Sequence, residues 1–289
     1  MQGRRRRREA GVAEKLELRT PNIALRTLLF TIAYEGTEYV GWQRQPAAAG
    51  VSVQGLIEEA HAQFAGHASV AGASRTDAGV HALGQAASVT SAAPQPVDAI
   101  RRAMNATLPQ DVRVLEVREM PRGFHARYHA KRKAYRYRID PAAVQLPFDR
   151  RFAWHVPHPC DLEAMRDAAA RFVGTHDFAS LQASGSAVRG TVRTLMRLDV
   201  IAGPGGEILI EVEGDGFLRY MVRSIVGTLV DVGHGRRPAH SIDAMLAARD
   251  RAQAGRTAPA HGLFLVKVSF GDGIQCEGAA RGDGDPASD

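Results

Sequence analysis

The chain has 289 residues, of which 45% are hydrophobic and 24% charged, and it carries a formal net charge of +6 at pH 7. This composition is typical of a globular protein long enough for two compact units, and no apolar run is long enough to cross a bilayer. The two cysteines, Cys160 and Cys276, lie far apart, which favours neither a disulfide scaffold nor a zinc site and fits the cytoplasm.

The first segment, residues 1–22, contains a basic block at Arg4–Arg8 and lacks apolar periodicity. We expect it to be a disordered, arginine-rich arm, because such a composition buries too little apolar surface to fold. Charged residues follow the block where an export signal would need an apolar stretch, so export is not expected.

The next segment, residues 23–120, alternates strand and helix patterns. Its expected elements are a strand at 25–34, a helix at 53–65, two strands on either side of Asp77, a helix at 97–108 and a strand at 112–117. This order, β-α-β-β-α-β, is that of a ferredoxin-like domain.

Residues 121–271 repeat the same order with one additional helix. The expected elements are a strand at 134–139, a helix at 161–173, strands at 191–201 and 207–213, helices at 217–232 and 241–251, and a strand at 263–270. We therefore predict an α+β protein of two ferredoxin-like halves, whose antiparallel sheets line a central cleft. Residues 272–289 are rich in Gly and Asp, and they are expected to be a disordered tail.

Unusual chemistry is concentrated in the turn between the two middle strands of the first half. Arg75, Asp77 and His81 lie within seven residues, whereas a plain turn needs only Asp and Gly. From these residue types alone, a capped turn with a solvated arginine is the simpler interpretation, because short motifs give many false positives.

Four stretches in the right order together resemble the tRNA pseudouridine synthase A family. They are Gly41-Trp42-Gln43-Arg44-Gln45, Arg75-Thr76-Asp77-Ala78-Gly79-Val80-His81, Phe124-His125-Ala126-Arg127 followed by Ala134-Tyr135-Arg136-Tyr137, and the run from Phe217 to Gly227. The resemblance covers about residues 24–270. It departs from the family at Ser224, where Asn is usual, and at Leu181, where an aromatic residue is common.

The resemblance implies a homodimeric isomerase that binds tRNA and needs no cofactor. It would convert uridine to pseudouridine at positions 38, 39 and 40 in the anticodon stem and loop. Asp77 would be the nucleophile that breaks the glycosidic bond, by attack on either the sugar or the base. Tyr135 would stack on the extruded uracil or move a proton, and Arg75 would help the base leave the helix.

The resemblance also implies that Arg44, Lys133, Tyr135 and Arg219 bind the substrate in an RNA-binding cleft. Arg219 and Arg223 are four residues apart, so they share a helix face. We expect Arg223 to lie against Asp77, orienting its carboxylate and lowering its pKa. Alternatively, Arg223 binds an RNA phosphate, as basic helix faces commonly do.

Two other functions stay open from the residues themselves. A non-catalytic RNA-binding protein of tandem ferredoxin-like domains would have no need for Asp77, Tyr135 and Arg223 together. A phosphate hydrolase with an Asp nucleophile would want a magnesium site, and the sequence offers no paired acidic motif for one. His125 and His129 lack carboxylate partners nearby, so no metal site is expected.

Overall fold

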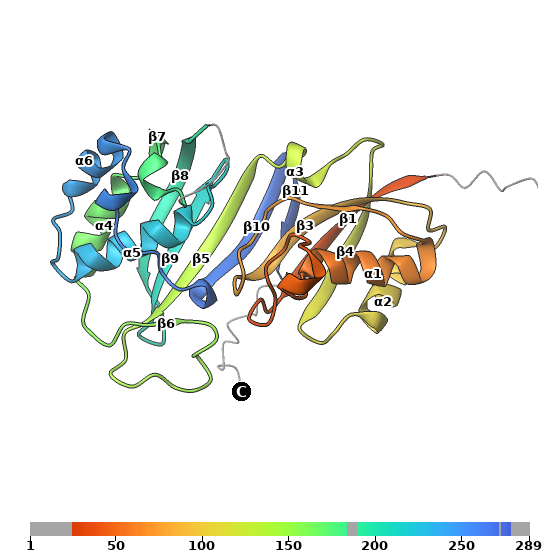
Figure 1. Ribbon diagram of the computed structural model, residues 1–289, viewed down its shortest axis with the longest axis horizontal. Helices are drawn as coiled ribbons and strands as arrows, with labels where there is room; N and C mark the ends of the chain where they lie inside the picture. Colours follow the sequence, from red (N-terminus) through yellow and green to blue (C-terminus); the bar gives the residue numbers. More distant parts are fainter. Residues whose placement is uncertain (1–24, 184–189, 272, 279–289) are drawn as a thin grey trace, which may run out of the picture.

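The computed structural model describes residues 25–183, 190–271 and 273–278. The expected arm at 1–22 and most of the expected tail lie outside these residues. The described chain is a mixed α+β structure built on one large sheet. Apart from the one-turn helix Ala126–His129, its helices form two groups at opposite ends of the molecule, with strands between them (Figure 1). None of the described helices is long and apolar enough to cross a membrane.

The elements of the first half match the predicted order. They are β1 (Arg26–Tyr34), α1 (Val53–Ala65), β2 (Val70–Gly72), β3 (His81–Ser91), α2 (Val97–Thr107) and β4 (Val112–Met120), with a short 3₁₀ turn at Ala47–Ala49 before α1. Helix α1 begins where predicted because the Ser52 side chain accepts a hydrogen bond from the Gly55 amide.

The second half contains the predicted elements and four short ones that the periodicity did not reveal. It runs α3 (Ala126–His129), β5 (Arg132–Asp140), β6 (Trp154–His155), α4 (Leu162–Ala170), β7 (Gly174–Asp177), β8 (Val192–Ala202), β9 (Ile208–Gly214), α5 (Met221–Gly233), α6 (Ser241–Ala248), β10 (Leu263–Gly271) and β11 (Ile274–Glu277), with 3₁₀ turns at Ala179–Leu181, Arg251–Gln253 and Ala260–Gly262. The elements missed are α3, β6, β7 and β11, each four residues or fewer.

Helices α4 and α6 and strand β4 each end three residues away from the predicted position, and two further boundaries are wrong. Helix α5 begins at Met221 instead of Phe217, because Tyr220 has a left-handed backbone that no α-helix can contain. The expected disordered tail does not begin at residue 272, because β11 pairs antiparallel with β10 from Lys267 to Gly271.

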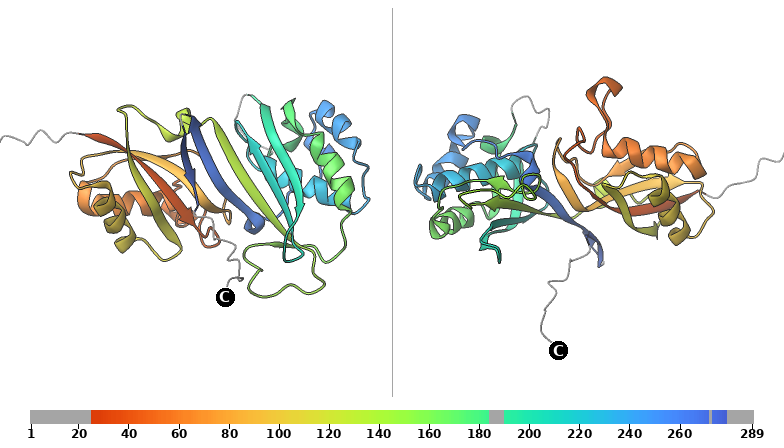
Figure 2. Two further views of the ribbon diagram at one scale, coloured as in Figure 1. Left: turned by 180° about the vertical axis from the view of Figure 1, so that it is seen from behind. Right: turned by 90° about the horizontal axis from the view of Figure 1, so that it is seen from below.

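The two halves share a single sheet, which corrects the prediction of separate antiparallel sheets. Its strand order is β4-β1-β3-β10-β5-β9-β8-β7, and Figure 2 shows β10, from the second half, where the two halves meet. Strand β2 covers only the far part of β3, from Ala87 to Val89. The other end of β3 is left with unpaired backbone groups, and β10 pairs there in parallel, Phe264 with His81.

This junction places the turn that precedes β3 close to β5, because β10 pairs with both strands. The core of the second half is organised by α5, whose residues Met221, Ile225 and Leu229 are all buried. A side chain at Gly227 would collide with the Arg256 carbonyl oxygen, so this glycine lets residues 256–258 lie directly on the helix.

Candidate active site

A cavity of about 720 Å³ lies between the two halves. Its walls come from the turn at 72–78, from β5 and from the segment that leads into α5 at 217–223. This volume lies in the usual range of about 300–1,000 Å³ for sites that hold a small ligand. The cavity collects residues from all four stretches singled out in the sequence, with Gln43 and Gln45 contributed by the first.

The turn that carries Asp77 is held from behind by the Gly41-Trp42 stretch. The Trp42 amide donates to the Thr76 carbonyl oxygen at 3.1 Å, and the Thr76 hydroxyl lies 2.7 Å from the Tyr34 hydroxyl. Gly41 has a φ of +102°, and a side chain there would meet the Thr76 oxygen at 2.6 Å. The Gly41-Trp42 stretch therefore supports the turn.

Two guanidinium groups face the Asp77 carboxylate. Arg223 Nη1 lies 3.5 Å from Asp77 Oδ2, and Arg219 Nε lies 3.9 Å from Oδ1. The Arg223 side chain is 15% exposed and its Nε donates to the Ala258 carbonyl oxygen at 2.7 Å, whereas the Arg219 side chain is 59% exposed. Arg223 is therefore the anchored partner and Arg219 the solvated one.

The net effect of this environment is to raise the pKa of Asp77 above its ordinary value. Burial is the largest cause, and the charges of Arg223 and Arg219 offset part of it. The sequence-based expectation of a lowered pKa is therefore wrong in its net direction, although the arginines act in the expected sense. Desolvation prevails because the carboxylate lies in the shielded interior of the cavity.

Tyr135 lies on β5 and faces the same cavity. Its hydroxyl is 2.6 Å from Ser74 Oγ, and its ring meets the Phe217 ring edge-on with the centroids 5.1 Å apart. Burial, with a smaller contribution from the Asp77 charge, raises the pKa of Tyr135 to about 12. The phenol is therefore neutral at physiological pH and is able to donate a hydrogen bond.

Gln85 is a supporting residue that the sequence reasoning missed. It is fully buried on β3, and its amide bonds the Ser74 backbone twice. Ser74 N donates to Gln85 Oε1 at 3.2 Å, and Gln85 Nε2 donates to the Ser74 carbonyl oxygen at 2.8 Å. A glutamine among the small and apolar residues of a strand was the available signal, because a buried amide needs partners.

Three cations line the cavity near Tyr135, namely Arg127, Lys133 and Arg193. None of them forms an ion pair with a carboxylate within the part of the chain that the structure describes. Burial and the two neighbouring arginines lower the pKa of Lys133 to about 8, partly offset by Asp215. These unpaired charges make the wall of the cavity suitable for an anion.

The other predicted site residues lie in different surroundings. Arg75 lines the cavity and is exposed. Arg44 does not line it, and its guanidinium pairs with Glu58 at 3.2 Å and Glu59 at 3.5 Å on α1. The structure therefore groups Arg75, Lys133, Tyr135 and Arg219 with Asp77 and Arg223 and leaves Arg44 apart.

His81 is a buried structural residue. Its Nδ1 accepts from the Gly36 amide at 3.0 Å, and Nε2 lies 2.9 Å from the Arg151 carbonyl oxygen. Its ring stacks on Phe264, and burial lowers its pKa, so the imidazole stays neutral. Since both ring nitrogens are used in the fold, His81 is not free to hold a metal.

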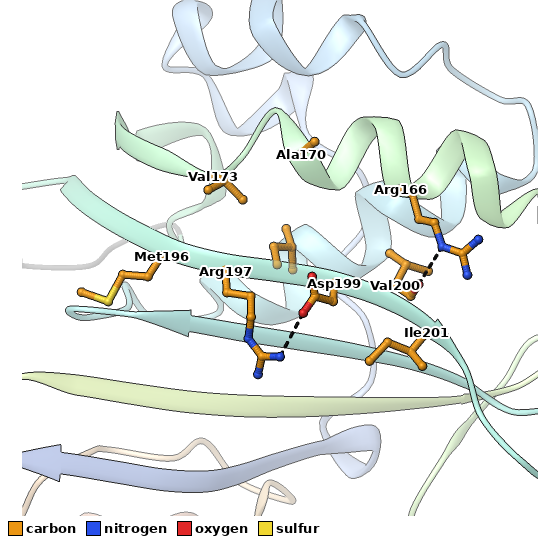
Figure 3. A pocket seen from close by; sticks show the side chains of 9 residues that line it. Arg166, Ala170, Val173, Met196, Arg197, Asp199, Val200 and Ile201 are labelled. Carbon is orange, nitrogen blue, oxygen red and sulfur yellow. Dashed lines mark hydrogen bonds and ion pairs between the residues drawn. The ribbon is translucent and has the colours of Figure 1, made fainter. Parts of the chain in front are cut away.

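A second hollow of about 600 Å³ lies between α4 and β8 (Figure 3). Its charged groups are engaged locally: Arg197 Nη1 donates to Asp199 Oδ2 at 3.0 Å, and Arg166 Nε donates to the Val200 carbonyl oxygen at 2.9 Å. This hollow has no counterpart of the Asp77 arrangement, so the cavity between the halves is the candidate active site.

Comparison with known proteins points to one family. A family model described as tRNA pseudouridine synthase matches residues 31–129 and 168–271, which include Asp77, Arg219 and Arg223. The tRNA pseudouridine synthase A of Syntrophotalea carbinolica is 48% identical over 240 residues, covering 83% of this chain and 94% of the relative. Proteins of the same name from Moorella thermoacetica and Myxococcus xanthus are 46% and 43% identical, covering 84% and 85% of this chain and 99% and 92% of their own length.

Among solved structures, a chain in a Cbf5-Nop10-Gar1 complex aligns with 83% of this chain and 49% of its own length. The TM-score is 0.35 and the identity 12%, a likeness too distant to bear on the site.

Proposed function

Since the chain belongs to the tRNA pseudouridine synthase family and is an isomerase that converts uridine to pseudouridine in tRNA, we propose that Asp77 is its nucleophile. We further propose that its targets are uridines 38, 39 and 40 in the anticodon stem and loop. The observation that supports the nucleophile most directly is the Asp77 carboxylate, 21% exposed, between two guanidiniums in the cavity. A non-catalytic RNA-binding protein would not need this arrangement.

The reaction exchanges one bond to the sugar for another. The N1–C1′ bond of the uridine breaks, the uracil turns over, and a C5–C1′ bond forms while C5 loses a proton and N1 gains one. A carboxylate divides this change into two easier steps by forming and then releasing a covalent bond to the nucleoside. The atoms balance without a redox partner, so the chain itself has only to supply the nucleophile, orientation and proton transfer.

The neighbouring residues have separate roles in this proposal. Arg223 orients Asp77 and offsets part of the desolvation that disfavours the ionised form. Tyr135 contacts the extruded uracil, with its neutral hydroxyl held by Ser74. Arg75, exposed at the cavity, occupies the gap that the target base leaves in the RNA helix.

The RNA backbone is proposed to run past the unpaired cations Arg127, Lys133 and Arg193. Arginines of β5 that point to the other side of the strand are already neutralised: Arg136 pairs with Glu211 at 2.6 Å, and Arg138 with Glu207 at 2.7 Å. Phosphate groups are attracted by uncompensated charge, so the cavity side is the better RNA surface. Arg44, which is paired on α1, is proposed to contribute only at the edge of this path.

We propose a homodimer on the basis of the loop between β5 and β6. Three large apolar side chains in this loop are strongly exposed: Val144 at 79%, Leu146 at 61% and Phe148 at 83%. Such a group of apolar residues is unusual on a monomer and suits a contact with a second copy.

Both cysteines are free, which fits a reducing cytoplasm.

We also propose that the two halves, residues 23–120 and 121–271, are ferredoxin-like units. The first has the strand order β4-β1-β3-β2 and the second the order β10-β5-β9-β8. When the short strands β6 and β7 are left out of the count, both orders read fourth, first, third, second, which supports a repeated architecture.

Mapping pseudouridine in tRNA from cells with and without the gene tests the targets. Loss of pseudouridine at positions 38–40, restored by the wild-type gene and not by an Asp77→Asn gene, is the expected result. Pseudouridine lost from another part of tRNA would refute the proposed positions, and restoration by the Asp77→Asn gene would refute the nucleophile.

A further inference from the structure

Tyr220 has a backbone conformation that is unfavourable for its residue type. Its φ is 66° and its ψ is 0°, in the left-handed region that L-residues other than Asn and Asp rarely adopt. In the part of the chain that the structure describes, the only other non-glycine residue with positive φ is Arg249, at the end of α6. Left-handed residues are common at helix C-termini, whereas Tyr220 precedes the first turn of α5.

Helix capping does not account for this residue. Tyr220 occupies the N-cap position of α5, and its side chain makes no capping hydrogen bond. Ser, Thr, Asp or Asn would stabilise this end of the helix better. A tyrosine at this position therefore strains the backbone and makes no capping hydrogen bond that would offset the strain.

The ring of Tyr220 contacts both arginines that face Asp77. The guanidinium carbons of Arg219 and Arg223 each lie 4.8 Å from the ring centroid, and Arg219 Nη2 donates to the Tyr220 hydroxyl at 3.1 Å. An aromatic face attracts a guanidinium, and these attractions help to hold two like charges close together. The same two arginines lie 3.9 Å and 3.5 Å from the Asp77 carboxylate.

The left-handed conformation also stops the helical pattern that begins at Phe217. In a continuous helix, Phe217 would lie on the same stripe as Met221 and Ile225, which face the core. Instead the chain turns, and Phe217 meets Tyr135 edge-on in the cavity. The strained turn at Tyr220 is therefore part of the segment that places Phe217 against Tyr135 and the two arginines beside Asp77.

We propose that Tyr220 is a positioning residue that clamps Arg219 and Arg223 beside Asp77, and that its strained backbone is retained because it aims the ring at both guanidiniums. This inference rests on the proposed role of Asp77. It assigns Tyr220 no contact with the reacting atoms. The clamp acts by limiting the movement of the two side chains that hold the carboxylate in place.

Three variants of Tyr220 distinguish the effect of losing the aromatic ring from the effect of backbone strain. Tyr220→Phe keeps the ring and should keep kcat within about threefold. Tyr220→Ala and Tyr220→Gly both remove the ring and should lower kcat roughly 30-fold or more with tRNA affinity nearly unchanged, because small misplacements of catalytic groups are costly. Only glycine fits the left-handed backbone, so Tyr220→Gly should melt about 2–4 °C above Tyr220→Ala.

A second measurement does not depend on catalysis. The titration of the Asp77 carboxyl is followed by carbon NMR in the free protein. This carboxyl faces Arg219, Arg223 and the neutral Tyr135 hydroxyl. Its pKa should rise further in Tyr220→Ala, because the guanidiniums that lower it are no longer held. In Tyr220→Phe the titration should stay close to that of the wild type.

The outcomes are distinct. Wild-type turnover in Tyr220→Gly, or an unchanged Asp77 titration in Tyr220→Ala, overturns the clamp. Equal melting temperatures for Tyr220→Ala and Tyr220→Gly would refute the claim that the left-handed backbone at this position costs stability. If Asp77→Asn retains turnover while Tyr220→Ala still shifts the Asp77 titration, the clamp stands and the proposed nucleophile is wrong.

Discussion

Arg223 Nη1 lies 3.5 Å from Asp77 Oδ2, although the two residues are 146 positions apart in the chain. Asp77 comes from a turn of the first half, and Arg223 from the first turn of α5 in the second half. The contact depends on the shared sheet, in which β10 pairs with the strand that follows the Asp77 turn. Asp77 and Arg223 are therefore brought together only when both halves have folded.

Replacing Arg223 with Ala should slow the chemical step by about 100-fold or more and leave tRNA affinity nearly intact. The pKa of Asp77 should rise further, because Arg223 offsets part of the burial effect. Single-turnover rates across pH, measured beside equilibrium tRNA binding, check this. Arg219→Ala is the matched control and should have a smaller effect, since that side chain is 59% exposed. Weaker binding with a flatter salt dependence and normal saturated turnover would instead make Arg223 a phosphate contact.

Asp77→Asn should bind tRNA, lack turnover and be more stable than the wild type at pH 7. The folded protein raises the pKa of Asp77, so the stability of the wild type falls as the pH rises above the unfolded pKa of this group and through its folded pKa. The amide removes that cost, and the difference in melting temperature should disappear below about pH 4, where the carboxyl is protonated in both states. Thermal melts from pH 3 to 8 measure this. A variant that keeps a tenth of wild-type turnover would exclude Asp77 as the nucleophile.

The Ser74 and Tyr135 hydroxyls should act as one unit. We expect Ser74→Ala to lower kcat by about tenfold, because a hydrogen bond that orients a reacting group is lost. In a double-mutant cycle, Ser74→Ala should add little once Tyr135→Phe is present. Fully additive losses would show that the 2.6 Å contact has no catalytic role.

Tyr137 supplies the control for this cycle. It lies on the same face of β5, and its hydroxyl donates to the Pro259 carbonyl oxygen at 2.8 Å. Tyr137→Phe should cost about 1 kcal/mol of stability and leave kcat unchanged.

Lys133 should make tRNA binding depend on pH. Its pKa is lowered to about 8 by burial and nearby arginines, so its charge is lost as the pH rises from 7 to 9 and tRNA affinity should fall. Lys133→Arg should bind equally well across this range, because arginine does not titrate there. The exposed Lys131, replaced by Arg, is the control and should leave the pH dependence in place. An unchanged pH dependence in Lys133→Arg would remove Lys133 from the RNA path.

The long elements could be predicted because each has an apolar pattern that is local in sequence. Helix α1 was placed at its observed bounds from its regular apolar spacing, and the structure adds a cap at Ser52. Very short elements such as β6 and β11 have no such pattern, because their stability comes from the strand beside them. The start of α5 was misplaced because the turn at Tyr220 serves contacts with distant residues.

Sequence by itself singled out the residues that we propose carry the chemistry, since Asp77, Tyr135 and Arg223 lie in recognisable stretches. The tertiary structure decided how they act on one another. The net direction of the Asp77 pKa shift, the support of Tyr135 by Ser74 and Gln85, and the contact of Tyr220 with two arginines all depend on burial and on distances across the halves. Desolvation and hydrogen bonding are set by surroundings that assemble only on folding, and no local pattern of residues contains them.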